Sequence, residues 1–564
     1  MKRINLIIIL LLVMGFGYSQ DDIIYPNYIV KFTDKNGTPF SIDNPEEFLS
    51  TKAIERRNKQ GIAIDETDLP INPEYAQAII DAGAQVRNRL KWFNSVSVEI
   101  PDISVFNQIT ALAFVSEVKL VSSNGVGKRP VRTQEKDLLG NTGATLVSKS
   151  INDLNYGESF NQINMINGTQ LHADGYLGQN MLIAVFDGGF GFANEMTAFD
   201  SLWMNDKIIG TQDFVVPGGD VFDFFETASV HGTWVLSAMG AYIDNHLIGT
   251  APKASYYLIR SEDDRDPASE YLMEEYYWLD GAEFVDSIGV DIISASLTYF
   301  DAFYDPEFNH SYEDMDGNTT PITKAADMAA SKGILLVNSN GNQGDASWYY
   351  MGAPADGDSV LSIGAVDANG NYASFSSHGP TYDGRIKPDV TAQGENPVLA
   401  DIEGGITTDF SGTSFSAPII AGMSACLWQA NPAANNYQIL SAIRQSASVY
   451  NNPNADIGYG IPDYSLADQI LKQILGIKTP LANEMNVKIC PNPFLNQIKL
   501  EFNEAITTRI TATIYDMHGQ LIYRKTIHDR TSNIDELGNA SSGIYYLHLA
   551  DENGQINSYK LIKL

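Results

Sequence analysis

The stretch GTSFSAPIIAGMSACLW at 412–428 constrains the fold of this chain more than any other part of it. Its apolar residues recur at near-helical spacing over a length that suits a buried helix. Pro418 has no N–H and is tolerated only near the start of a helix, so we expect the helix to begin at Ser414. The Ser414 hydroxyl then lies at a helix N-terminus, where free N–H groups and the helix dipole favour negative charge. The stretch predicts either a serine nucleophile or a serine that only caps a helix.

Two further stretches supply what a serine nucleophile needs, namely a base and a carboxylate that orients the base. MLIAVFDGGF at 181–190 contains a short apolar run, typical of a buried parallel strand, that ends at Asp187. HGTWVLSAMG at 231–240 places His231 ahead of a helix rich in small residues. Taken alone, Asp187 could be a turn residue and His231 a structural histidine. Together with Ser414 they are the candidate catalytic residues.

The order Asp187, His231, Ser414 resembles that of subtilases, the peptidases of family S8. Further segments agree with the family in sequence and in order: GTAPKASYYLIR at 249–260, DIISASLTY at 291–299, GNQG at 341–344, IKPDVTAQG at 386–394 and GYGIPD at 458–463. The resemblance covers residues 152–473. It implies a secreted serine endopeptidase that hydrolyses peptide bonds of protein or peptide substrates through an acyl-enzyme intermediate.

The resemblance also assigns further site residues. Asn342 stands where the family has its oxyanion-hole asparagine, and Ser296, Leu297 and Thr298 lie in the segment that borders the S1 pocket. Family members need no cofactor for this chemistry, although many carry structural calcium. One common calcium site would fall in AYIDNHLIG at 241–249, a segment shorter than the family pattern. Structural calcium therefore stays open, and the resemblance leaves its ligands unassigned.

Two positions depart from the family pattern. Gly188 follows Asp187 directly where the family has Thr or Ser, so a hydroxyl is missing beside the carboxylate. Leu236 replaces a smaller residue in the helix after His231. Two other classes of function also stay open: a catalytically silent homologue that binds partners at the cell surface, and an esterase-type hydrolase. The intact triad counts against the first, and the lack of a G-x-S-x-G elbow around Ser414 counts against the second.

Chain length and net charge limit the number of domains and the classes of function. The chain has 564 residues, which suggests about three or four domains. Its net charge of −33 argues against nucleic-acid binding, because affinity for phosphate comes from clustered Lys and Arg, and suits a soluble protein outside the cell. The two cysteines, Cys426 and Cys490, are expected to be a buried apolar residue and an unrelated thiol, although an oxidising compartment would permit a bridge.

The first residues, MKRINLIIILLLVMGFGYSQ, form a positive n-region, an apolar core and a small-residue exit. This pattern predicts a signal peptide over 1–19, cleaved after Ser19 or one residue later. The apolar run is short and charge follows at Asp21, which argues against a transmembrane anchor. We therefore expect the chain to be exported.

Residues 20–122 predict a small α+β domain. The pattern indicates strands at 25–32, 93–100 and 115–121 and an amphipathic helix at 72–84. The domain's ending resembles the inhibitor-like propeptides of subtilases, which cover the substrate face of the catalytic domain and assist its folding. The alternative is a permanently attached binding domain. The polar stretch 123–151 is expected to be an exposed linker where processing occurs.

Between 152 and 473, strands alternate with helical patterns. This order predicts an α/β domain with a mostly parallel sheet and helices on both faces. The run SEDDRDPASEYLMEE at 261–275 is strongly acidic. We expect it either to be solvated surface or to line the substrate cleft and favour basic substrate residues.

A linker at 474–485 precedes short alternating strands over 486–564, which predict an antiparallel β-sandwich. The segments PNP, YDMHG, GIYYL and KLIKL, in that order, resemble the C-terminal sorting domain of the type IX secretion system. The resemblance implies export through the periplasm to the outside or to the cell surface, with the secretion machinery as a partner. The alternative is a retained adhesive domain.

Overall fold

The computed structural model describes residues 26–123, 154–223, 227–263, 270–476, 487–502, 509–516, 521–535, 537–538, 540–550 and 556–563. The expected signal peptide and most of the two expected linkers lie outside these residues. The chain divides into two compact units, 1–475 and 476–564, which are described separately. In the described residues, no helix has both the length and the apolar character that crossing a membrane requires.

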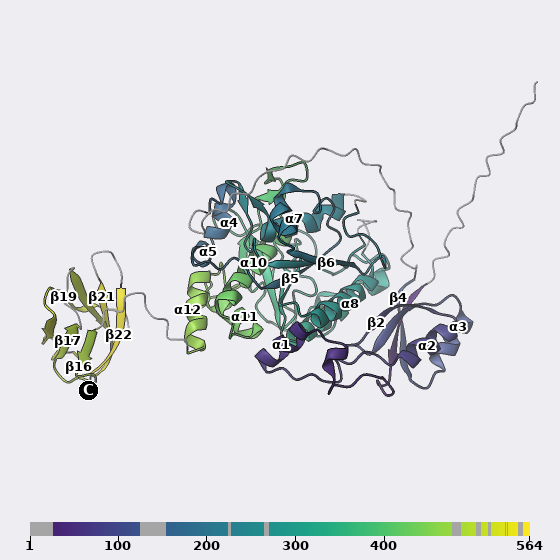
Figure 1. The fold of residues 1–564 in the computed structure, drawn as a ribbon, viewed down its shortest axis with the longest axis horizontal. Helices are drawn as coiled ribbons and strands as arrows, with labels where there is room; N and C mark the ends of the chain where they lie inside the picture. Colours follow the sequence, from purple (N-terminus) through teal and green to yellow (C-terminus); the bar gives the residue numbers. More distant parts are fainter. Residues whose placement is uncertain are drawn as a thin grey trace, which may run out of the picture. The chain divides into compact units, whose positions relative to one another are not determined.

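The central domain, residues 154–475, is built on a sheet of seven strands (Figure 1). The strands are β5 (Leu182–Asp187), β6 (Ile208–Asp213), β9 (Ser255–Arg260), β10 (Ile292–Ala295), β11 (Leu335–Ser339), β12 (Val360–Val366) and β13 (Val390–Gln393). Their order across the sheet is β13-β12-β11-β10-β5-β9-β6, and every neighbouring pair is parallel. This confirms the parallel sheet that the apolar runs predicted.

Helices cover both faces of this sheet because alternate residues of its strands point to opposite sides. Ile183 and Val185 of β5 join one core cluster, and Ala184 and Phe186 join another. The first cluster is closed by α7 (His231–Gly240), α10 (Thr413–Ala430), α11 (Asn436–Gln445) and α12 (Tyr464–Ile474), and the second by α8 (Leu272–Ile288) and α9 (Pro321–Ser331). Leu236, larger than the family pattern, is buried in the first cluster.

Shorter elements complete the central domain. They are α4 (Phe160–Asn164), α5 (Thr169–Ala173), α6 (Asp200–Met204) and the small hairpins β7 (Tyr242–Ile243) with β8 (Leu247–Ile248) and β14 (Leu399–Ala400) with β15 (Ile406–Thr407). Cys426 is buried in α10, where its thiol donates to the carbonyl of Thr250 at 3.2 Å. Both Cys426 and Cys490 are free thiols.

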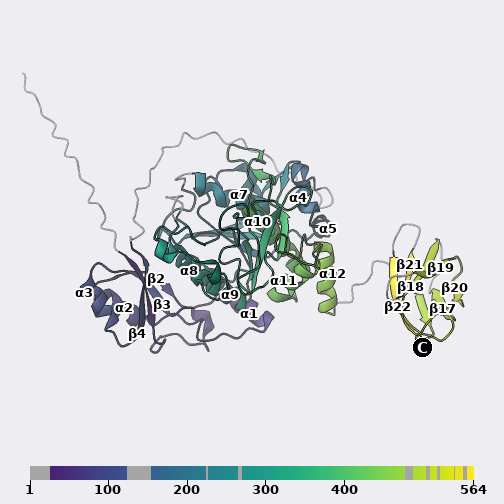
Figure 2. The same ribbon diagram turned by 180° about the vertical axis from the view of Figure 1, so that it is seen from behind.

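The N-terminal domain, residues 26–123, is an antiparallel sheet with two helices on one face. Its strands β1 (Asn27–Phe32), β2 (Gln85–Leu90), β3 (Ser95–Glu99) and β4 (Val115–Ser122) lie in the order β2-β3-β1-β4. Helices α2 (Pro73–Asp81) and α3 (Ile103–Thr110) close its core. A further helix, α1 (Thr51–Gln60), leaves this sandwich and lies beside the central domain (Figures 1 and 2). The sequence pattern did not predict α1.

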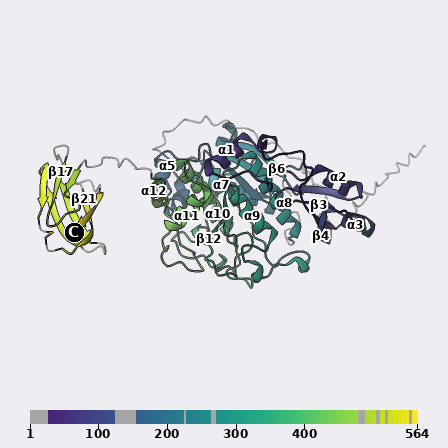
Figure 3. The same cartoon turned by 90° about the horizontal axis from the view of Figure 1, so that it is seen from below.

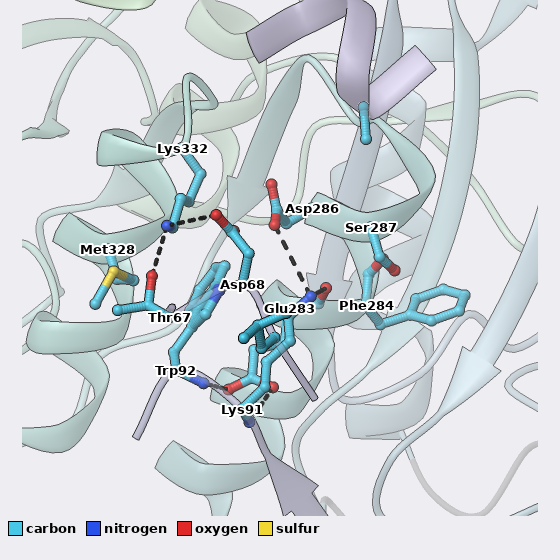
Figure 4. A network of polar contacts seen from close by, with 12 residues as sticks. Thr67, Asp68, Lys91, Trp92, Glu283, Phe284, Asp286, Ser287, Met328 and Lys332 are labelled. Carbon is cyan, nitrogen blue, oxygen red and sulfur yellow. Dashed lines mark hydrogen bonds and ion pairs between the residues drawn. The ribbon is translucent and has the colours of Figure 1, made fainter. Parts of the chain in front are cut away.

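The other face of the N-terminal sheet packs on α8 (Figures 1 and 3). Its Leu90, Trp92 and Val121 belong to the same core cluster as residues of α8. The carboxylate of Glu283 in α8 accepts hydrogen bonds from the backbone N–H groups of Lys91 at 2.7 Å and Trp92 at 2.9 Å (Figure 4). The N-terminal domain is thus docked through both apolar and polar contacts.

The C-terminal unit is a separate antiparallel β-sandwich. One sheet holds β16 (Val487–Cys490), β17 (Ile498–Phe502) and β20 (Thr531–Ile534), and the other holds β18 (Ile510–Asp516), β19 (Leu521–Ile527), β21 (Gly543–Ala550) and β22 (Ile556–Lys563). Phe494, Leu500, Ile514, Leu547 and Leu561 are buried between them. The alternating pattern of this region therefore predicted its architecture correctly.

Candidate active site

The three candidate catalytic residues come from the ends of three elements. Asp187 is the last residue of β5, His231 the first of α7 and Ser414 the second of α10. Helices α7 and α10 pack against each other and share one core cluster. Helix α10 begins at Thr413, one residue before the predicted start. The three residues therefore lie at the carboxyl edge of the parallel sheet, where open α/β sheets place their sites.

Asp187 holds the imidazole of His231. Its Oδ1 and Oδ2 atoms lie 2.9 and 3.0 Å from His231 Nδ1, and Asp187 is 1% exposed. An ionised carboxylate only accepts hydrogen bonds, so Nδ1 must carry the proton. This leaves Nε2 as the basic nitrogen of the neutral ring. The backbone N–H of Gly188 also donates to Asp187 Oδ1, at 2.9 Å, in the place where the family pattern has a hydroxyl-bearing residue.

The glycine after His231 permits this close approach. A Cβ at Gly232 would lie 2.4 Å from the carbonyl oxygen of Gly189 and 2.9 Å from Asp187 Cβ. Any other residue at position 232 would push α7 away from the end of β5. The His-Gly pair is therefore required by packing as well as by chemistry.

The N-terminus of α10 lies beside the imidazole. The ring of Phe415, the residue after Ser414, has its centroid 5.8 Å from that of His231. Ser414 itself is 8% exposed. Because the N–H groups of the first helical turn have no partner within the helix, this turn favours negative charge next to the Ser414 hydroxyl. The sequence-predicted nucleophile, base and carboxylate are thus gathered at one place.

Pro418 leaves the backbone carbonyl of Ser414 without its regular helical hydrogen-bond donor. In a regular helix the N–H of residue 418 would donate to the carbonyl of Ser414, but proline has no N–H. The hydroxyl of Ser296 donates to that carbonyl instead, at 2.9 Å. Ser296, expected only as a border of the S1 pocket, therefore also fixes the backbone of the nucleophile.

We expect Ser296→Ala to lower the free energy of unfolding by about 1–3 kcal/mol, because it leaves the buried carbonyl of Ser414 without a donor. In a Pro418→Ala background the N–H of residue 418 supplies that donor, so the same change should cost less than about 1 kcal/mol. Urea unfolding of the four chains, all carrying Ser414→Ala to prevent self-digestion, measures the difference. An equal loss of unfolding free energy from Ser296→Ala in both backgrounds would contradict the role assigned to the Ser296 hydroxyl.

Asn342 is held against the start of α10. Its Oδ1 accepts hydrogen bonds from the Thr413 N–H at 2.8 Å and from the Thr413 hydroxyl at 2.9 Å. These two donors fix which way the amide faces, so Nδ2 is the atom left to donate. Asn342 is exposed. An amide N–H held in this way beside a serine nucleophile is suited to stabilising an oxyanion. Thr413 was not predicted, although it lies next to Ser414.

Asn342→Leu should lower kcat by about 10²–10³-fold with little change in KM, because the amide acts only once negative charge has developed. This magnitude is the one known for removing one oxyanion-hole donor from a serine peptidase. Steady-state kinetics on a peptide substrate, with the exposed Asn452→Leu as a matched control, test the expectation. An unchanged kcat would remove Asn342 from the mechanism.

The segment 296–298 lies opposite the turn that leads to Asn342. The Thr298 methyl group is 3.5 Å from where a Cβ of Gly341 would be. Behind the segment, the buried amide of Asn338 in β11 donates to the carbonyl of Leu297 at 2.9 Å. Sequence reasoning missed Asn338, although a polar residue inside the apolar run GILLVNS was a visible signal.

The acidic run at 261–275 is only partly solvated where it is described. Asp263, Glu274 and Glu275 are buried, whereas Glu262 and Glu270 are partly exposed. Glu275 accepts hydrogen bonds from the Ile322 N–H at 2.9 Å and pairs with His310 Nε2 at 2.6 Å. These carboxylates connect α8 to neighbouring segments, which explains why they tolerate burial. Residues 264–269 lie outside the described part of the chain.

Nothing in the described ranges groups three or more His, Cys, Asp or Glu side chains as metal ligands. At the β7–β8 turn, where structural calcium was considered, Asn245 Oδ1 accepts from Asn155 at 2.8 Å and His246 pairs with Glu158 at 3.1 Å. Both side chains therefore have protein partners.

Family models match three successive parts of the chain. The model described as the subtilase family matches residues 178–460. A model for the peptidase S8 propeptide domain of Bacteroidota matches 27–137, and one for a secretion system C-terminal sorting domain matches 488–563. The subtilase match lies within the central domain and the sorting-domain match within the C-terminal unit, whereas the propeptide match extends past Ser123 to residues outside the described part of the chain.

Individual relatives are more distant. Subtilisin E of Bacillus subtilis (strain 168) is 28% identical over 296 residues, which cover 51% of this chain and 66% of the relative. Subtilisin of Bacillus pumilus is 28% identical over 313 residues, covering 54% of this chain and 98% of the relative. The solved self-cleaved protease domain of PatA is 24% identical, with a TM-score of 0.40, and the match covers 52% of this chain and 97% of that one. The subtilase model spans half of the chain and includes Asp187, His231 and Ser414, so this chain belongs to the subtilase family.

Proposed function

We propose that this protein is a secreted serine endopeptidase that cleaves protein or peptide substrates. Ser414 Oγ attacks the scissile carbonyl while His231 Nε2 takes its proton. The imidazolium then gives that proton to the leaving amine, and water hydrolyses the acyl-enzyme by the same route. Asp187 stabilises the imidazolium throughout, and Asn342 Nδ2 with the Ser414 N–H stabilises the oxyanion. The contact of Asp187 with His231 Nδ1 at the start of α7 carries this proposal.

Substrate is expected to bind along 296–298. Leu297 is held from behind by Asn338, and Ser296 is tied to the Ser414 carbonyl. A peptide held against this segment would therefore lie in a fixed register with the nucleophile. We propose that Ser296, Leu297 and Thr298 border the pocket for the residue before the scissile bond.

One set of assays distinguishes this function from its two rivals. Fluorophosphonate labelling of Ser414 together with cleavage of casein supports the endopeptidase. Absence of labelling in the mature protein would support a catalytically silent homologue. Labelling with hydrolysis of short-chain esters but not of casein would support an esterase.

We further propose that the N-terminal domain covers the substrate site until the chain is processed within 123–151. Ser123, the last described residue before this linker, donates from its N–H and hydroxyl to Asp305 at 2.9 and 2.7 Å. Asp305 belongs to the loop that follows 296–298. The chain therefore leaves the N-terminal domain close to the proposed substrate segment.

The docking of this domain should depend on pH through Glu283. Burial raises the pKa of Glu283 from its ordinary 4.5 to about 8 and that of Asp280, also in α8, from 3.8 to about 6. Both groups then hold protons more tightly in the docked state than when exposed. From pH 5 upward the complex should weaken, by up to about tenfold per pH unit for each carboxyl that titrates: Asp280 until about pH 6 and Glu283 until about pH 8. Lys91 lies beside Glu283 and offsets part of the rise in its pKa, whereas the pKa of nearby Lys35, lowered to about 8 by burial, affects the complex only above about pH 8.

The measurement uses a Ser414→Ala chain carrying, between 124 and 153, the recognition sequence of an unrelated protease. After cutting, gel filtration from pH 5 to 9 gives the fraction of N-terminal fragment that stays bound. Glu283→Gln should flatten the pH profile. A flat profile in the chain that retains Glu283 would show that this carboxyl does not change its proton affinity on docking.

We propose that the C-terminal unit directs export through the type IX secretion machinery, to the outside or the cell surface by way of the periplasm. The sorting-domain match supports this role, and the unit has a hydrophobic core of its own. Deleting 486–564 should leave peptidase activity intact but retain the protein in the periplasm of its native host. Appearance of the truncated protein outside the cell at the normal rate would rule out a sorting role.

A further inference from the structure

Helix α1 belongs to the N-terminal domain but lies beside the end of the central sheet that is opposite the active site. Asp291, just before β10, accepts hydrogen bonds from Lys52 of α1 and from the N–H of Leu182 at the start of β5, both at 2.8 Å. The active site lies at the opposite, carboxyl ends of β5 and β10. Figures 1 and 2 show α1 away from the sandwich that packs on α8.

The C-terminal ends of α8 and α9 form part of the surface that α1 contacts. Gly289 and Gly333 follow α8 and α9 with φ values of 87° and 90°, the left-handed conformation that ends many helices. A Cβ at Gly289 would lie 2.7 Å from the Ala53 nitrogen, and one at Gly333 would lie 2.8 Å from Gln60 Nε2. Both helix ends are thus in direct contact with α1.

Arg56 of α1 satisfies carbonyl groups at these helix ends. Its guanidinium donates to the carbonyl oxygens of Asp286 and Lys332, both at 3.3 Å, and to that of Val290. The last carbonyl groups of a helix lack the regular donor one turn further on, although that of Asp286 also accepts from the Gly289 N–H at 3.1 Å. Cationic side chains are favoured there because the helix dipole leaves partial negative charge. Arg56 therefore caps α8 and α9 from another domain.

Arg57 forms the buried centre of the contact. Its Nη2 atom lies 2.9 and 2.8 Å from the two carboxylate oxygens of Asp286 in α8, and 3.0 Å from Asp68 Oδ1 in the return loop. Lys332, after α9, donates to Thr67 Oγ1 at 2.6 Å and to Asp68 Oδ2 at 3.2 Å (Figure 4). Arg57, Asp68 and Asp286 are fully buried. Asp286 also pairs with Arg56, and Asp68 with Lys332, so removing Arg57 would take away the cation that bridges the two buried carboxylates and leave each with one partner fewer.

We propose that α1 and its return loop, residues 51–72, are an anchor that binds an exosite on the central domain, remote from the active site. The exosite consists of Asp286, Asp291, Lys332 and the carbonyl groups at the ends of α8 and α9. The partner it fits is a helix carrying two adjacent arginines, which this chain supplies as Arg56 and Arg57. Because the sandwich and the anchor are linked modules that bind one domain, each raises the effective concentration of the other. The anchor keeps the N-terminal domain bound after the linker is cut, even when the part of the chain next to the active site is released.

This inference rests on the proposed propeptide role of residues 26–123, but not on cleavage by Ser414. The test uses the Ser414→Ala chain cut by the unrelated protease, so peptidase activity does not enter. The N-terminal fragment should elute with the central domain at micromolar concentration. Arg57→Ala should raise its dissociation constant by about 10²–10³-fold. Lys59→Ala, which removes an exposed charge from the same helix, should change it by less than about threefold.

Two results would overturn the anchor. One is separation of the unsubstituted fragment from the central domain after cutting, and the other is equal affinity of the Arg57→Ala and Lys59→Ala fragments. If Arg57→Ala does not fold, the anchor is tested by hydrogen exchange on the cut Ser414→Ala complex, which carries no further substitution. Amides of α1 that exchange as slowly as those of α8 support the anchor, and amides that exchange freely contradict it. Failure of fluorophosphonate labelling would overturn the proposed peptidase but leave these measurements valid.

Discussion

Ser414→Ala is expected to lower kcat by about 10⁶-fold and to leave the chain uncut between its N-terminal and central domains. The size of the loss is that known for the nucleophile of subtilisin itself. The substitution removes the atom that forms the acyl-enzyme, and His231 then has no proton to take. If the same serine carries out maturation, the variant should appear on a gel as one full-length species. The unsubstituted protein should give a shorter chain that begins within 123–151.

Ser416→Ala is the matched control, because Ser416 lies in the same helix and its hydroxyl donates only to the carbonyl of Thr413 among the described residues, at 3.0 Å. This variant should keep activity and processing. Purification from a host that lacks other proteases is needed for the comparison. Normal processing of Ser414→Ala under those conditions would show that another agent cuts the linker. Cleavage of casein by Ser414→Ala at the rate of the unsubstituted protein would exclude Ser414 as the nucleophile.

Asp187→Asn should lower kcat by about 10⁴-fold while leaving the fold intact. An asparagine amide can donate to His231 Nδ1, which would place the imidazole proton on Nε2 and remove the base. It also carries no charge to stabilise the imidazolium. Asp187 is buried, and an asparagine side chain has nearly the same size and shape, so the amide fits without large rearrangement.

Steady-state kinetics and fluorophosphonate labelling rates measure this loss. Asp174→Asn, an exposed carboxylate that accepts only from Gln170 among the described residues, is the control and should leave both rates unchanged. A decrease of less than about tenfold in Asp187→Asn would mean that Asp187 positions α7 without acting in the chemistry.

The sheet and the places of the three candidate catalytic residues were predictable because the signals are local. A parallel strand buried on both faces appears as a continuous apolar run, as in 181–187 and 334–339, and a site at its carboxyl end follows from the topology. Ser414 and His231 each stand at the start of a helix that the sequence marks with small and apolar residues. Asn342 was found through a short motif next to such a strand.

Helix α1 was not predictable for a physical reason. Its sequence, TKAIERRNKQ, has no apolar stripe, because the side chains that it buries most deeply include Arg56 and Arg57. Charged residues are ordinarily solvated, and their burial here depends on Asp286, which lies more than two hundred positions along the chain. The bond from Ser296 to the Ser414 carbonyl is similarly invisible in sequence, although Pro418 showed that some donor was missing. Long-range polar contacts of this kind have no periodic signature.

The position of the N-terminal domain has a consequence for the order in which the chain folds. Parallel strands that are distant in sequence pair slowly, and β5 must pair with β10, where Ile183 lies opposite Ile292. The N-terminal domain is synthesised first and contacts α8 and the end of α9, the elements that flank β10 in the chain. Holding these two helices fixes the place where β10 must insert, which reduces the search for its partners. A chain without residues 26–123 should therefore refold more slowly after dilution from urea, and adding the domain back in trans should restore the rate.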